Sequence, residues 1–202
     1  MKNLKNYIIE SILDVEDNID NIDKNIKDQI KQFLKDNFKG YSSCKISRKP
    51  NNDGKYEVFS TGDIAVKNKS ITSLTNGVFI WNNIGRNFNC WGCKSLISLE
   101  GAPKKVGGDF ICWGCNSLTS LEGAPKEVKG DFICYNCKSL TSLEGAPKVV
   151  GGDFNCFGCH SLKSLEGIPK EIGRTFCCVD CGSKFTQEDV KKISNVKGTI
   201  DV

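Results

Sequence analysis

Cysteines are the residues of this chain with the clearest capacity for chemistry, and 12 of its 202 residues are cysteine. Ten of them form five C-x-x-C pairs at a constant spacing: Cys90 and Cys93, Cys112 and Cys115, Cys134 and Cys137, Cys156 and Cys159, and Cys178 and Cys181. Two successive pairs give C-x2-C-x18-C-x2-C, a spacing typical of zinc ribbons, and such pairs also serve in thiol redox chemistry. A zinc-binding or redox protein is therefore one hypothesis.

The regular repetition of these pairs favours a different interpretation. Every inner pair has two equivalent neighbours, and five pairs cannot be divided into sites of four cysteines. Cysteine is a small, frequently buried residue that packs as an apolar side chain. We therefore predict a ladder of cysteines in the core with no cofactor, and keep the zinc or redox role as the alternative. The opening sequence MKNLKNYIIES does not resemble a secretory signal, so reduced thiols are expected.

A 22-residue repeat positions the cysteines. Gly107–Val128 reads GGDFICWGCNSLTSLEGAPKEV, similar blocks begin at Gly85, Lys129 and Gly151, and a fifth block begins at Gly173 and then breaks off. Tandem repeats of this length form solenoids, because one unit cannot bury its apolar face alone and must stack on its neighbours. Function is therefore expected on columns of equivalent residues.

Two short strands are predicted in each coil, near Asp109–Cys112 and near Ser120–Glu122. The leucines follow one another at steps of three, which suits the bends of a coil, and Gly123 and Pro125 oppose a helix. The predicted interior contains the repeated phenylalanines and leucines: Phe88, Phe110, Phe132, Phe154, Phe176, Leu96, Leu118, Leu140, Leu162, Leu99, Leu121, Leu143 and Leu165. The predicted fold class is a mostly β repeat solenoid.

An outward-facing column of aromatic residues is the candidate binding surface. Phe110 and Cys112 alternate with Ile111 and Trp113, so the second pair should point outward if the first points inward. The candidate partner-binding residues are Trp91, Ile111, Trp113, Ile133, Tyr135 and Phe157. A large exposed apolar stripe indicates a protein partner or self-association through this face. The alternative is that these rings are buried, by the coil itself or by the N-terminal helix.

The repeats lie between two flanking regions. Residues 1–40 have apolar side chains at helical spacing and predict an amphipathic segment that docks on the open end of the solenoid or, alternatively, binds a partner. Residues 41–61 predict a β-hairpin or linker, and residues 62–84 a degenerate N-terminal capping repeat. Five coils are expected over 85–185. A capping box at Thr186–Asp189 predicts a C-terminal helical cap over 186–202, whose last residues could add a strand.

The phrase C-x-S-L-x-S-L-x-G-x-P-x-x-V is similar to the leucine-rich repeats of the BspA-like class, and its 22-residue GGDFxCxxCxSLxSLEGAPKxV form resembles repeat proteins of tailed phages of gut bacteria. The resemblance covers residues 62–202 and implies a leucine-rich-repeat-like solenoid encoded by a phage and located in the host cytoplasm or the virion. This chain departs from the class where GDFIC alternates like a strand instead of a short helix. Ile8, Ile9 and Glu10 also resemble the cleavage site of targeting peptides on phage head cargo.

Composition excludes several classes of function. The formal net charge of +4 is too small to predict nucleic-acid binding, and no apolar run is long enough for a membrane span. The single histidine, His160, occupies a variable column, and the repeats provide no isolated nucleophile beside a base. We therefore expect no enzymatic activity. The predicted function is a protein-interaction solenoid with an unknown host or phage partner; the alternatives are a zinc or redox protein and packaged phage cargo.

Overall fold

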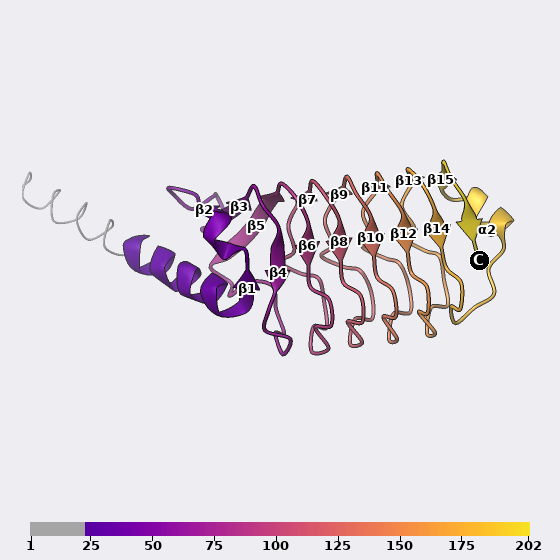
Figure 1. The fold of residues 1–202 in the computed structure, drawn as a ribbon, viewed down its shortest axis with the longest axis horizontal. Helices are drawn as coiled ribbons and strands as arrows, with labels where there is room; N and C mark the ends of the chain where they lie inside the picture. Colours follow the sequence, from indigo (N-terminus) through magenta and orange to yellow (C-terminus); the bar gives the residue numbers. More distant parts are fainter. Residues whose placement is uncertain (1–22) are drawn as a thin grey trace, which may run out of the picture.

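The computed structural model describes residues 23–202, which form an elongated β-solenoid (Figure 1). Two eight-stranded sheets run along its length, and each coil contributes one short strand to each sheet. Equivalent residues of successive coils lie side by side: Phe132 pairs with Phe110 on one side and with Phe154 on the other. The prediction of a mostly β repeat solenoid is confirmed.

The first sheet contains one strand from each coil: β4 (Ile64–Val66), β6 (Phe88–Asn89), β8 (Phe110–Ile111), β10 (Phe132–Ile133), β12 (Phe154–Asn155), β14 (Phe176–Cys177) and β16 (Ile200–Asp201). The second contains β3 (Tyr56–Ser60), β5 (Phe79–Ile84), β7 (Lys105–Val106), β9 (Glu127–Val128), β11 (Val149–Val150), β13 (Glu171–Ile172) and β15 (Asn195–Val196). These strands pair in parallel. At the N-terminal edges, β1 (Phe38–Lys39) and β2 (Cys44–Ile46) pair antiparallel to β4 and β3.

The second strand of each coil lies further along the repeat than predicted. The strand expected near Asp109–Cys112 is β8, but Ser120–Glu122 forms turns, and the second strand is β9. Leucines three residues apart are accommodated by tight turns: Leu118 N donates to Cys115 O (3.1 Å), and Ala124 N donates to Leu121 O (3.0 Å). The β-branched Val128, which is 1% exposed, provides the inward residue of the actual strand.

The solenoid continues past the five predicted coils toward the C-terminus. The helix α2 (Gln187–Lys191) begins at Thr186 with the predicted capping box, in which Thr186 and Asp189 exchange hydrogen bonds. The helix is an insertion within a coil, because the chain then forms β15 and β16, which pair in register with β13 and β14. The region predicted as a helical cap is therefore largely one more coil. The strand predicted for its last residues is β16.

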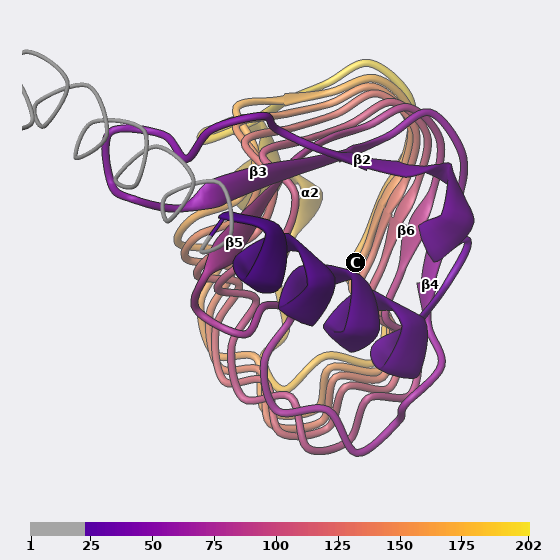
Figure 2. The ribbon, with the colours of Figure 1, turned by 90° about the vertical axis from the view of Figure 1, so that its left-hand side faces the viewer.

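A helix over residues 23–37 covers the N-terminal end of the solenoid, as Figure 2 shows. Ile30 and Leu34 are fully buried, and the ring centroid of Phe33 lies 5.8 Å from that of Phe79 in β5. Docking of this helix is confirmed over the described residues; Ile8, Ile9 and Glu10 lie outside them. In the described part of the chain, no helix is both long and apolar enough to span the membrane.

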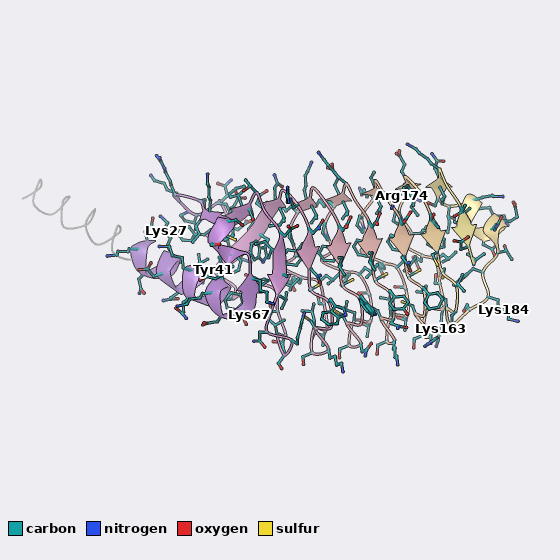
Figure 3. All side chains as sticks on the ribbon, in the orientation of Figure 1. Lys27, Tyr41, Lys67, Lys163, Arg174 and Lys184 are labelled. Carbon is teal, nitrogen blue, oxygen red and sulfur yellow. The ribbon has the colours of Figure 1, made fainter. Side chains whose placement is uncertain are left out.

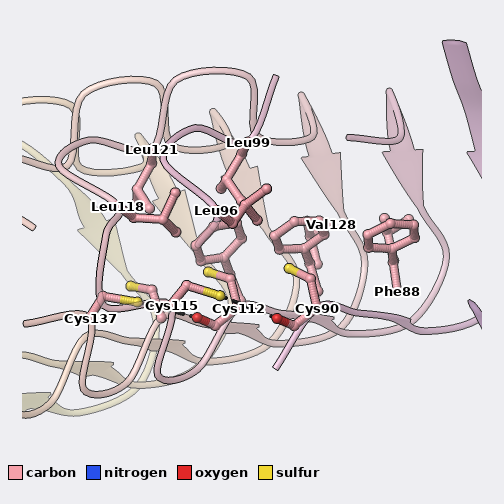
Figure 4. Packing of buried hydrophobic residues seen from close by; sticks show 14 of the residues in the cluster. Phe88, Cys90, Leu96, Leu99, Cys112, Cys115, Leu118, Leu121, Val128 and Cys137 are labelled. Carbon is pink, nitrogen blue, oxygen red and sulfur yellow. Dashed lines mark hydrogen bonds between the residues drawn. The ribbon is translucent and has the colours of Figure 1, made fainter. Parts of the chain in front are cut away.

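The core consists of the predicted columns. The rings of the repeated phenylalanines stack on one another, with centroids 5.2 Å apart for Phe110 and Phe132 and for Phe132 and Phe154. The two leucine columns are buried, and Figure 4 shows Leu96, Leu99, Leu118 and Leu121 close to the phenylalanine rings. Charged side chains such as Lys163 and Lys184 project from the outside of the coils (Figure 3).

A ladder of hydrogen bonds through side-chain oxygens fixes the distance between coils. The carboxylate of Asp109 accepts a hydrogen bond from the backbone N–H of Asp131 (2.8 Å), and Asp131 accepts in the same way from Asp153 (2.8 Å). The residue before each of these aspartates is glycine because of this contact: a Cβ on Gly130 would lie 2.2 Å from Asp109 Oδ1. The Gly-Asp step of the repeat is thus a packing requirement.

Candidate functional site

Four aromatic side chains form a continuous outer column, which we call the aromatic ladder: Trp91, Trp113, Tyr135 and Phe157. The centroids of neighbouring rings are 5.7, 5.4 and 5.2 Å apart. Trp91 is 46% exposed and Trp113 is 41% exposed, whereas Tyr135 and Phe157 are partly buried. The exposed part of the ladder is therefore concentrated on the two tryptophans.

The backbone holds the ladder in register. Each aromatic residue follows a strand of the first sheet and precedes a tight turn, in which Gly92 and Gly114 have φ of +69° and +68°. The N–H of Gly92 donates to the carbonyl of Trp113 (2.8 Å), and that of Gly114 donates to the carbonyl of Tyr135 (2.9 Å). These bonds join the backbone beside each ring to the backbone of the next coil. The two tryptophans therefore lie on a rigid part of the fold.

The neighbouring isoleucine column contributes less exposed surface than predicted. Ile111 and Ile133 are partly buried, and asparagines occupy the same column in the flanking coils. The side chain of Asn89 accepts a hydrogen bond from Trp91 N (2.8 Å), and that of Asn155 accepts one from Phe157 N (3.0 Å). These two asparagines thus stabilise the turns that follow their strands. The exposed apolar stripe is therefore narrower than the sequence predicts.

A lysine lies at the N-terminal end of the aromatic ladder, and the sequence analysis did not predict it as part of the site. Lys69 Nζ lies 4.9 Å from the ring centroid of Trp91 and also donates a hydrogen bond to the Trp91 carbonyl. This is a cation–π contact, which is typically more favourable with tryptophan than with other aromatic residues. Lys69 belongs to an irregular coil, because Ile64 pairs with Phe88, which is two residues further along the chain than the 22-residue period requires. The periodicity therefore could not predict where the side chain of Lys69 lies.

Comparisons with known proteins do not assign this chain to a family. No family model, curated protein or solved structure matches it. The resemblance to BspA-like repeats and a phage origin therefore stay predictions. The proposals for this chain rest on the geometry of its exposed and buried columns.

The ten paired cysteines form an interior column, which we call the cysteine ladder. Figure 4 shows part of it, with Cys90, Cys112, Cys115 and Cys137 labelled. Nine are buried, as predicted, and Cys181 in the last pair is partly exposed. Their thiols bond across coils: Cys115 Sγ donates to Cys90 O and Cys137 Sγ to Cys112 O, each at 3.2 Å. The second cysteine of each later pair makes the same contact, because Cys159 Sγ donates to Cys134 O and Cys181 Sγ to Cys156 O, each at 3.3 Å. These contacts between coils support the packing role predicted for these residues.

The C-terminal end of the cysteine ladder has a different geometry. The Sγ atoms of Cys156, Cys178 and Cys181 lie within 4.8 Å of one another, and this is the one group of three potential metal ligands within residues 23–202. Hydrogen bonds from Cys156 and then from Cys178 lower the pKa of the Cys181 thiol to about 4. Hydrogen bonding to Cys178 and Cys181, together with burial, raises the pKa of Cys156 well above its ordinary value. The other seven paired cysteines are not gathered into a group of this kind.

Proposed function

We propose that this chain is a non-enzymatic interaction solenoid that binds a partner protein through the exposed part of the aromatic ladder. The observation that carries the proposal is the exposure of Trp91 and Trp113, at 46% and 41%, on turns whose backbone is hydrogen-bonded to the next coil. Tryptophan is strongly enriched among the residues that dominate the energy of protein interfaces. A side chain of this size that is held in place loses little conformational entropy on binding, so the free energy of burying it is available to the complex.

The arrangement of the rings favours a protein partner over a nucleic acid. Proteins that bind single-stranded nucleic acids stack the bases on the free faces of aromatic side chains. In this ladder the rings contact one another: Trp91 and Trp113 are tilted at 43°, and Trp113 and Tyr135 meet at 66° in an edge-to-face contact. Lys69 also lies over the ring of Trp91. The tryptophans are thus engaged by protein groups, and their remaining exposed surface suits the apolar side chains of a partner protein.

The charges beside the ladder indicate the kind of protein segment that fits it. Lys69 lies over Trp91, and the exposed Lys94 and Lys138 follow the aromatic residues of their coils by three positions. A partner segment with apolar side chains along its centre and acidic residues at its margin would complement this surface. Such charges at the rim of an interface mainly accelerate association and provide specificity, while the buried tryptophans provide affinity.

The proposal is tested by comparing a Trp91→Ser/Trp113→Ser double variant with Ile97→Ser. Ile97 is a matched control because it is also a large exposed apolar residue, at 67% exposure, but lies outside the ladder. Affinity capture from expressing cells, with quantitative mass spectrometry, measures which proteins the wild type retains. We expect the tryptophan variant to lose its partner by at least about 30-fold in affinity, which corresponds to about 2 kcal/mol, and the control to keep it.

Two results would contradict the proposal. Retention of the same partner by the tryptophan variant would show that binding occurs elsewhere. Loss of the folded state, measured by circular dichroism and thermal unfolding, would show that the two rings are structural. Sedimentation of the wild type at increasing concentration distinguishes self-association from binding of another protein, because only self-association makes the mass depend on the concentration of this chain.

A further inference from the structure

The last two coils bring three thiols together at the C-terminal end of the cysteine ladder. Cys156 comes from the coil of β12, and Cys178 and Cys181 form the C-x-x-C pair that follows β14. The Sγ atoms of Cys178 and Cys181 are 2.8 Å apart, and all three sulfur atoms lie within 4.8 Å of one another. Cys156 and Cys178 are 0% and 3% exposed, whereas Cys181 is partly exposed.

These distances suit a shared metal ion. A thiolate binds zinc at about 2.3 Å, so two thiolates on one ion lie about 3.8 Å apart in tetrahedral and about 4 Å apart in trigonal geometry. The sulfur atoms need shifts of about 1 Å or less to reach such positions, which rotation about the Cα–Cβ bonds provides. Thiolate is also the ligand that selects monovalent copper and zinc over harder ions.

The backbone around the three cysteines is held by hydrogen bonds that do not involve their sulfur atoms. Cys156 N donates to Cys177 O (2.9 Å), and Cys178 N donates to Asp201 O in β16 (2.8 Å). The backbone positions of Cys156 and Cys178, which directly follow β12 and β14, are therefore set by the parallel sheet before any ion binds, and Cys181 lies beyond the turn that follows Cys178. Ligands anchored on or beside regular elements are held more precisely than ligands on a long loop.

We propose that the thiolates of Cys156, Cys178 and Cys181 bind one thiophilic metal ion, monovalent copper or zinc. Formation of each sulfur–metal bond releases the proton of any ligand that is still a thiol. The partly exposed Cys181 side gives the ion a route into the site. No fourth side-chain ligand belongs to the group within residues 23–202, and His160 Nδ1 is 3.1 Å from Asp180 O. Copper would be bound by three sulfurs, whereas zinc would add a water molecule as its fourth ligand.

The test uses the reduced full-length chain under anaerobic conditions, titrated separately with monovalent copper in acetonitrile and with Zn²⁺. Native mass spectrometry gives the stoichiometry, and competition with a chelator gives the affinity. We expect one ion per chain, and at least about a tenfold loss of affinity in Cys181→Ser, because even loss of a supporting contact to a metal ligand costs 10- to 100-fold. Cys177→Ser is the matched control, since Cys177 is also partly exposed and lies next to Cys178 but outside the group.

X-ray absorption on the loaded wild type counts the sulfur ligands without any substitution, so it decides the case even if a variant fails to fold. Three sulfurs alone support the copper form, and three sulfurs with one oxygen support the zinc form. The proposal is overturned if the reduced chain takes up neither ion in a one-to-one ratio. It is also overturned if several ions bind along the ladder, or if four sulfurs are found and Cys159→Ser abolishes binding.

Discussion

The hydrogen bonds between the side-chain oxygen of one coil and the backbone of the next determine two residue types at once, the acceptor and the glycine beside it. Asn87, in the first regular coil, occupies the aspartate position and accepts a hydrogen bond from Asp109 N (2.7 Å). Gly108 lies directly beside this contact, and a Cβ there would be 2.2 Å from Asn87 Oδ1. The side-chain oxygen thus satisfies a backbone donor of the next coil only because glycine leaves room for it.

Substitution of Gly108 by Ala should therefore lower the free energy of unfolding by about 1–3 kcal/mol, through overpacking against Asn87. Asn87→Ala alone should cost about 1 kcal/mol, since it removes one acceptor. In the double variant the collision with the oxygen is gone, so the combined loss should be smaller than the sum. Urea unfolding of the four proteins measures this coupling. Strict additivity would show that the side-chain oxygen does not impose glycine at this position.

The N-terminal helix is the element that closes the solenoid. The first coil would otherwise present the rings of Phe79 and Trp81 to solvent, and both are 0% exposed under the helix. The centroid of Phe38, at the helix end, lies 5.2 Å from that of Trp81 in an edge-to-face contact. A repeat array needs such a cover because its terminal repeat has an apolar face with no neighbouring repeat.

Leu34→Ala should lower the free energy of unfolding by about 2–5 kcal/mol, because Leu34 is only 2% exposed and its truncation leaves a cavity under the helix. The loss should be local, since each coil contacts chiefly its neighbours. We expect faster amide hydrogen exchange in β3 and β5 and unchanged exchange in β13. Lys35→Ala, on the exposed face, is the control and should leave exchange unchanged. Faster exchange in every strand after Leu34→Ala would contradict local capping.

At the scale of the whole molecule, repetition explains how much could be predicted from the sequence. The phenylalanine, leucine and cysteine columns were predicted correctly because one assignment, inward for Phe110, fixes the corresponding position in every coil. The prediction of a strand near Ser120–Glu122 was wrong, because periodicity cannot distinguish leucines in successive turns from leucines in a strand.

Features at the ends of the array could not be predicted in the same way. The contact of Lys69 with Trp91 arises in an irregular coil. The grouping of Cys156, Cys178 and Cys181 depends on distances in the last coils, whereas all five C-x-x-C pairs look equivalent in the sequence. The exposure of the aromatic ladder also changes along its length, from Trp91 at 46% to the partly buried Phe157. The first two differences arise where the stack is irregular or ends, which a repeating pattern does not encode.

The same one-dimensional architecture predicts that the cost of a core substitution depends on its position along the stack. Phe132 has stacked neighbours on both sides, with centroids 5.2 Å away, whereas Phe176 stacks on Phe154 alone, at 6.0 Å. Phe132→Ala should lower the free energy of unfolding by about 3–5 kcal/mol with an unchanged m-value in urea. Phe176→Ala should cost less and reduce the m-value, because the last coils can fray while the others stay folded. Equal losses with equal m-values would instead indicate that the solenoid unfolds as a single cooperative unit.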